Sequence, residues 1–119
     1  MVITQVRIRR KEDTGTRLKG IASINLDNML VIHDIKIIES DEGYFLAMPS
    51  KVIPNGSFKD IAHPISKDVR EVMEEIIING VKYMESNDLS DGTWNIAEDN
   101  TSKFLDLKFV DYSFNSLKL

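Results

Sequence analysis

The sequence of 119 residues contains no cysteine, and this absence excludes several classes of site. Disulfide scaffolds, cysteine nucleophiles and thiolate zinc or iron–sulfur centres all require that side chain. Histidine is also scarce, with two residues, so an imidazole-rich metal cage is not expected. No apolar run approaches the roughly 20 residues that cross a bilayer. The opening residues MVITQ are not a basic stretch followed by an apolar one. We therefore expect a cytoplasmic protein with no export signal, no membrane segment and no cofactor.

The chain also lacks the usual constellations of an active site. Its six glycines are scattered singly, so there is no glycine-rich phosphate loop. His33 lies inside an apolar strand pattern, where a hydrogen-bonded core histidine is expected, and Asp34 alternates to the opposite face. An enzyme is therefore not expected. A small metal-dependent enzyme using His33 and His63 stays open as a third alternative, provided that these side chains converge.

Charge is distributed unevenly along a chain that is acidic overall, with a net charge of −4. Residues 1–59 carry nine lysines and arginines against seven acids, whereas residues 60–119 carry six against twelve. Two interpretations remain open, namely solvated strand faces or a local anion-binding face. A negative total does not exclude nucleic-acid binding, because binding depends on the local field.

Alternating polar and apolar residues predict a series of strands joined by short turns. The pattern places strands at residues 2–10, 18–26, 29–38 and 44–48, with a short fifth strand at 58–62. The third strand is apolar on both faces, so we expect it to be central and covered on both sides. Consecutive strands with short turns form an antiparallel meander.

One amphipathic helix follows the strands. Ser66 is a good N-cap, and apolar residues then recur at helical spacing through about Ser86. Gly80 weakens this helix and marks a place where it could bend or end. The helix must lay its apolar stripe on the sheet, so the fold class is α+β. We assign residues 1–86 to this α+β domain.

Residues 87–119 form a C-terminal extension of different character. Its first part is polar, and Asp91-Gly92 there indicates a turn. The region from Phe104 to Phe114 is too apolar for a solvated tail. Alternation at Leu105, Leu107 and Phe109 predicts an added strand.

Basic side chains supply the candidate phosphate contacts. Arg7 and Arg9 share one strand face, within about 7 Å of each other by the strand rise. Arg17 on the return strand could join them. Lys51 lies on the loop after the fourth strand, and Lys59 follows an aromatic residue. Such cations position a phosphate backbone without reading its sequence, although simple solubility explains surface lysines equally well.

Three blocks of sequence resemble the stage V sporulation protein G family of septation proteins. They are VIHDI at residues 31–35, GYFLAMPSK at 43–51 and PNGSFKDIAHPI at 54–65. The opening VRIR at 6–9 and IASI-x-LD at 21–27 also resemble the first two strands of that family. The likeness covers residues 1 to about 75.

The resemblance implies a homodimeric bacterial regulator of asymmetric septation and sporulation that binds DNA, with RNA as a second candidate ligand. It also implies basic residues after A-M-P-S, and Lys51 matches that position, so Lys51 is the first choice among the candidate contacts. Val52 and Lys59 stand where the family usually has arginine. Replacing arginine by lysine keeps the charge but loses bidentate phosphate geometry.

Physical reasoning from the strands also favours a dimer that forms through the sheet. A meander with one helix leaves an edge strand and one sheet face to cover. Two-fold pairing would cover both and double the cationic surface. The alternative function is an interaction module for the cell-division machinery that binds no DNA directly and uses the sheet edge or the apolar C-terminal segment.

Overall fold

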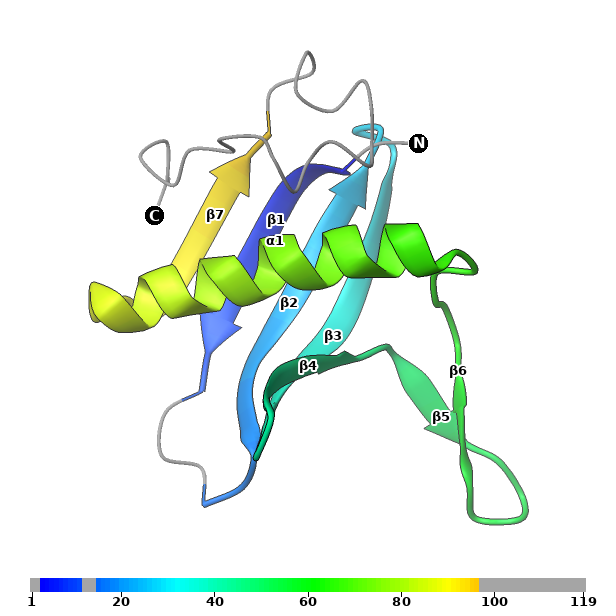
Figure 1. The fold of residues 1–119 in the computed structure, drawn as a ribbon. Coiled ribbons are helices and arrows are strands. Elements are labelled where there is room, and N and C mark those ends of the chain that lie inside the picture. Colours follow the sequence, from blue (N-terminus) through cyan, green and yellow to red (C-terminus); the bar gives the residue numbers. More distant parts are fainter. Residues whose placement is uncertain (1–2, 12–14, 97–119) are drawn as a thin grey trace.

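The computed structural model describes residues 3–11 and 15–96. These residues form a five-stranded antiparallel sheet in the order β4-β3-β2-β1-β7, a separate two-stranded ribbon and one helix (Figure 1). In chain order the elements are β1 (Ile3–Arg10), β2 (Leu18–Leu26), β3 (Leu30–Ser40), β4 (Gly43–Ala47), β5 (Ser50–Val52), β6 (Phe58–Asp60), α1 (Lys67–Ser86) and β7 (Asp91–Asn95). The predicted α+β class, with its meander followed by one helix, is confirmed.

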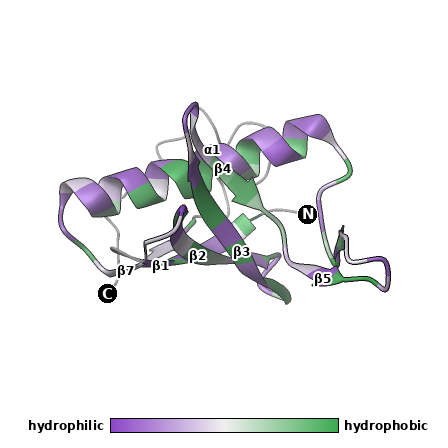
Figure 2. Cartoon of the chain, turned by 90° about the horizontal axis from the view of Figure 1, so that it is seen from below, coloured by the Kyte–Doolittle hydropathy of each residue, from purple (hydrophilic) through white to green (hydrophobic). Residues whose placement is uncertain are grey.

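The helix α1 and the sheet form two layers with the core between them (Figure 2). Strand alternation directs Val6 and Ile8 of β1 and Ala22 and Ile24 of β2 toward the helix, and all four are buried. The opposite residues of β1, including Arg7 and Arg9, are exposed on the outer face. The predicted alternation of these two strands is therefore confirmed.

The helix begins and ends close to the predicted residues. Ser66 is its N-cap, and the Ser66 hydroxyl accepts a hydrogen bond from the Val69 amide at 3.5 Å. The helix continues past Gly80 to Ser86, so the bend or end that the sequence allowed at Gly80 does not occur. Within the described residues, no helix combines the length and apolarity that a bilayer crossing needs.

The third strand differs from its prediction, because only one of its faces is covered. Ile35 and Ile37 are buried under the helix, whereas Leu30 and Val31 are exposed. His33 is exposed as well, so the expectation of a core histidine is wrong. An apolar composition on both faces predicted burial on both faces, but the single helix covers only one.

The predicted fifth strand forms, but it does not join the sheet. Residues of β6 pair with β5, in the segment expected to be a loop, and the two make a ribbon that extends beside the sheet (Figure 1). Every residue of both strands is exposed. The short strands lack an inward-facing apolar set that would anchor them on the core.

The described part of the C-terminal extension supplies the fifth strand of the sheet. Asp91-Gly92 begins β7, so the predicted turn is wrong there. In β7, Trp94 pairs with Val6 of β1 and is buried beneath the helix. The strand expected from Leu105 to Phe109 lies outside the described residues.

Candidate nucleic-acid interface

The ribbon of β5 and β6 places Lys51 directly opposite Lys59. Directly opposed residues of an antiparallel pair have Cβ atoms about 5 Å apart on the same face. The ribbon closes through a turn in which the Asn55 side chain accepts hydrogen bonds from the Ser57 amide at 2.9 Å and its hydroxyl at 2.6 Å. These bonds hold the hairpin tip, and the register then fixes the two lysines side by side.

Neither lysine has an acidic partner among residues 3–11 and 15–96, where the ion pairs involve other cations. Asp60 follows Lys59 but points to the opposite ribbon face by strand alternation. Like charges placed directly opposite each other destabilise a strand pair. A bound anion would relieve that repulsion, so the pair has the electrostatics of an anion site.

A second group of cations lines a hollow on the outer face of the sheet. The hollow has a volume of about 540 Å³, and Arg7, Arg9 and Lys11 line it. The same hollow contains Asp34 and Asp91, so its charge is mixed. It lies on the face of the sheet that α1 does not cover.

A β-bulge shapes this hollow. On β2, Ser23 alone opposes His33 and Asp34 of β3, because Ala22 pairs with Ile35 and Ile24 with Ile32. Asp34 has a φ of 62°, the left-handed conformation that a bulge can demand. The expectation that His33 and Asp34 face opposite sides is therefore wrong, since both line the same hollow. The Ser23 hydroxyl lies 3.1 Å from His33 Nδ1.

A smaller hollow of about 180 Å³ connects the sheet face to the base of the ribbon. Ile21 and Asp34 line both hollows, and the smaller one adds Lys36 and Ser50, the residue before Lys51. The two hollows therefore lie side by side between Arg7 and the ribbon. Sequence reasoning missed Lys36, because the third strand was expected to be covered on both faces.

The predicted arginines differ in the ion pairs and hydrogen bonds that they form. Arg9 Nε lies 3.2 Å from Asp91 Oδ1, so its charge is already partly compensated. Arg17 donates to the Glu39 carbonyl oxygen at 3.4 Å and lies 3.7 Å from Asp41, and it lines neither hollow. Arg7 has no ion pair with any other described residue. The structure thus groups Arg7 with Arg9 and Lys51 with Lys59, and it leaves Arg17 apart.

The described ranges contain no group of three or more His, Asp or Glu side chains that could hold a metal ion. His63 Nδ1 lies 3.0 Å from the Pro64 carbonyl oxygen, and His63 lines a different pocket from His33. The two histidines therefore do not converge, and the metal-site alternative on this pair is wrong.

Comparison with known proteins identifies the family of this chain. A family model described as SpoVG matches residues 1–85. The chain belongs to the SpoVG family.

Relatives in the SpoVG family match most of the chain and nearly all of their own length. A "Putative septation protein SpoVG" of Caldanaerobacter subterraneus is 46% identical over 87 residues, which are 73% of this chain and 94% of the relative. One from Caldicellulosiruptor saccharolyticus is 50% identical over 78 residues, 66% of this chain and 88% of the relative. A protein of Listeria monocytogenes named SpoVG 1 is 44% identical over 103 residues, 84% of this chain and all of the relative.

The SpoVG match spans all five predicted contact residues but ends before β7. The ribbon, the bulge and the outer face therefore lie within the SpoVG-like part of the chain. The strand β7, with Trp94 in the core, extends the sheet beyond residues 1–85, the range of the family model.

Proposed function

We propose that this SpoVG-family chain is a homodimeric regulator, without enzymatic activity, that binds DNA and, as a second candidate ligand, RNA. It would act in the cytoplasm in asymmetric septation and sporulation, which agrees with the septation names of its relatives. The single observation that carries the binding proposal is the opposed pair Lys51 and Lys59 on an exposed ribbon.

The ribbon suits a phosphate backbone for electrostatic reasons. Two lysine side chains that leave the ribbon from directly opposed positions can engage one phosphate or two neighbouring ones. Binding relieves their mutual repulsion, so the gain is larger than for two isolated lysines. The contacts carry no base information, and this predicts binding with little sequence preference from the ribbon itself.

The outer face of the sheet extends the proposed contact. Arg7 and Lys36 are exposed cations in adjoining hollows that lead to the base of the ribbon. Asp34 and Asp91 lie in the same region and reduce its net charge. We therefore assign the ribbon lysines the main role and Arg7 a supporting one, with Arg9 weakened by its ion pair.

The homodimer is supported by the apolar side of the same ribbon. Val52 and Phe58 oppose each other there, with 62% and 73% of their surfaces exposed. Exposed apolar residues in contact with each other mark interaction surfaces. A second copy covering them would also double the number of Lys51–Lys59 pairs, which compensates for the modest cationic patch of one protomer.

A mobility-shift titration with a DNA duplex at several salt concentrations tests the proposal. Binding should fall steeply with salt because phosphate contacts release counterions. The variant Lys51→Ala with Lys59→Ala should bind more weakly, and its slope of log K against log salt should be shallower by about 2 per chain.

The matched control removes two exposed lysines from the helix. Lys67→Ala with Lys82→Ala makes the same change in net charge, so long-range electrostatics change equally. Equal losses in the two double variants, or no binding by the parent protein at low salt, would contradict the ribbon as the contact. Circular dichroism of each variant checks that the fold is retained.

A second candidate function is an interaction module for the division machinery, favoured by the exposed Val52 and Phe58. Val52→Ser with Phe58→Ser distinguishes the two uses of the ribbon. If the apolar face serves the homodimer, light scattering should show a loss of dimer at micromolar concentrations. If it serves another protein, the mass in solution should stay unchanged.

A further inference from the structure

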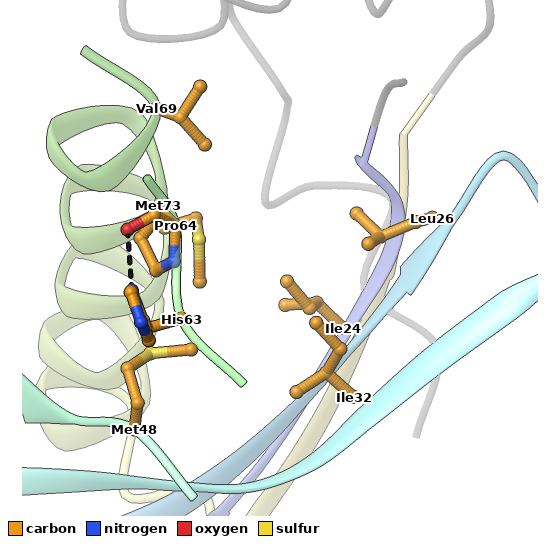
Figure 3. A pocket seen from close by; sticks show the side chains of 8 residues that line it. All are labelled: Ile24, Leu26, Ile32, Met48, His63, Pro64, Val69 and Met73. Atoms are coloured by element: carbon orange, nitrogen blue, oxygen red, sulfur yellow. Dashed lines mark hydrogen bonds between the residues drawn. The ribbon is translucent and has the colours of Figure 1, made fainter. Parts of the chain in front are cut away.

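The helix α1 leaves part of the inner sheet face uncovered near its N-terminal end. There an apolar groove of about 370 Å³ opens between the sheet and the start of the helix. Its sheet wall is formed by Ile24 and Leu26 of β2 and Ile32 of β3 (Figure 3). The groove is separate from the cationic hollows, which lie on the opposite face of the sheet.

The facing wall comes from the helix and from the chain that leads into it. Val69 and Met73 of α1 and Met48 after β4 project toward the sheet residues across the groove (Figure 3). His63 and Pro64 complete this wall. The imidazole of His63 is the only ionisable side chain among the lining residues described, so the groove suits an apolar occupant.

Three exposed apolar residues lie close in sequence to residues that line the groove. Met29 and Leu30 follow Leu26 through a tight turn and are 84% and 55% exposed, and Ile65 next to Pro64 is 96% exposed. Exposed apolar residues next to groove-lining residues favour a docking site here.

The described chain ends two strands away from the β2 wall of this groove. The amide of Ile96 donates to the Thr4 carbonyl oxygen at 2.9 Å, which continues β7 alongside β1. Ile3, the residue before Thr4 in β1, pairs with Leu26 in the groove wall. Only β1 separates β7 from β2, so Ile96 lies about 10 Å from the groove by strand spacing. The chain after Ile96 therefore begins about two strand spacings from the groove wall.

The sequence of that segment fits the occupant that the groove needs. Leu105, Leu107 and Phe109 alternate with Asp106 and Lys108, so an extended chain would present one apolar and one charged face. Eight residues join Ile96 to Leu105. Such a connection spans up to about 30 Å when extended, well beyond the distance to the groove.

We propose that residues 104–114 of the same chain dock in the apolar groove between α1 and the β2–β3 hairpin, with Leu105, Leu107 and Phe109 facing its walls. The docked segment would cover the inner sheet face that the helix leaves open. It would also pack against His63 and Pro64, and so support the base from which the β5–β6 ribbon projects. The inference does not depend on nucleic-acid binding.

Cross-linking in the full chain tests the docking directly, because the natural sequence has no cysteine. Val69→Cys in the groove is combined with Leu107→Cys in the segment and treated with a short bismaleimide. The expected product is an internally linked monomer whose yield is independent of protein concentration. The control pairs Lys82→Cys, an exposed position on the same helix, with Leu107→Cys. It should give several-fold less of the internally linked monomer.

Each other outcome of this experiment overturns the proposal. A product of dimer mass would assign the groove to the segment of a second copy. Equal internal linking at positions 69 and 82, or none at either, would mean that the segment does not dock there.

A fluorescence measurement gives an independent readout. Leu105→Ser, Leu107→Ser and Phe109→Ser together should expose the groove and raise the fluorescence of added anilinonaphthalene sulfonate several-fold. The matched control, Asp106→Ser, Lys108→Ser and Asp111→Ser, changes the polar residues of the same segment and should leave the fluorescence unchanged. Equal signals from the two triple variants would overturn the docking.

Discussion

Gly80 of α1 packs directly on Ile8 of β1, so closely that a Cβ at position 80 would lie 2.7 Å from Ile8 Cδ1. The ring of Trp94 lies 3.5 Å from the same point, and all three residues are buried. A glycine that costs helix propensity is therefore the residue that lets the helix approach the sheet at β1 and β7.

The close approach predicts energetic coupling between positions 80 and 8. In an open helix position, Gly→Ala adds about 1 kcal/mol of stability, whereas overpacking a core costs about 1–3 kcal/mol. Gly80→Ala alone should therefore fail to stabilise the protein. Ile8→Val removes the conflicting Cδ1 at a cost of about 1 kcal/mol by itself. In the Gly80→Ala background that cost should shrink or change sign, as measured by urea unfolding of all four proteins.

Trp94 should contribute strongly to stability although it lies beyond the residues that the family model matches. Its side chain is 2% exposed, and its ring meets that of Tyr83 edge to face at 6.4 Å. Trp94→Ala should lower the free energy of unfolding by about 3–5 kcal/mol because it leaves a large cavity. Asn95→Ala, on the exposed side of the same strand, should change it by about 0.5 kcal/mol or less. Similar effects at the two positions would argue against a structural role for β7.

The ion pair between Arg9 and Asp91 predicts a gain of nucleic-acid affinity on removal of the acid. Asp91→Asn frees the Arg9 guanidinium and removes a negative charge from the hollow. Affinity for a DNA duplex should rise at low salt, and the difference should shrink as salt screens the charges. Asp68→Asn, in the first turn of the helix, makes the same change in net charge away from the outer face. An equal gain from this control would mean that net charge alone is responsible.

Tyr44 links β4 to the end of the helix and predicts a pH dependence of stability. Burial, followed by the hydrogen bond that the Tyr44 hydroxyl donates to Glu85 at 2.5 Å, raises the pKa of Tyr44 well above its usual value. A pKa that is higher in the folded state adds stability that is complete below about pH 10 and is lost as pH rises further.

Tyr44→Phe checks this sign. The free energy of unfolding of the variant at neutral pH should be about 1 kcal/mol lower than that of the parent, because the variant lacks the hydrogen bond to Glu85. Its deficit in free energy of unfolding relative to the parent should narrow above pH 10, because only the parent carries the Tyr44 hydroxyl. A deficit that stays constant to pH 11 in urea unfolding would show that the folded state does not perturb Tyr44.

The local sequence pattern determined where the first strands and the helix lie and which of their faces are buried. The alternation in residues 2–10 and 18–26 decided which side chains are buried, because successive residues of a strand point to opposite faces. Ser66 and the helical spacing after it fixed α1 for an equally local reason. The motifs around Lys51 and Lys59 identified the family and the two cations on the ribbon.

Only the tertiary structure decided which segments meet. Strand pattern does not specify the partner, so the pairing of β6 with β5 and of β7 with β1 could not be read from the chain. The bulge put His33 and Asp34 on one face, since one extra residue shifts the alternation by one position. Burial of Trp94 depends on contacts with β1 and α1, which lie far from it in sequence. Sequence patterns report which face of an element is apolar, and the neighbour that covers it is chosen by packing between distant parts of the chain.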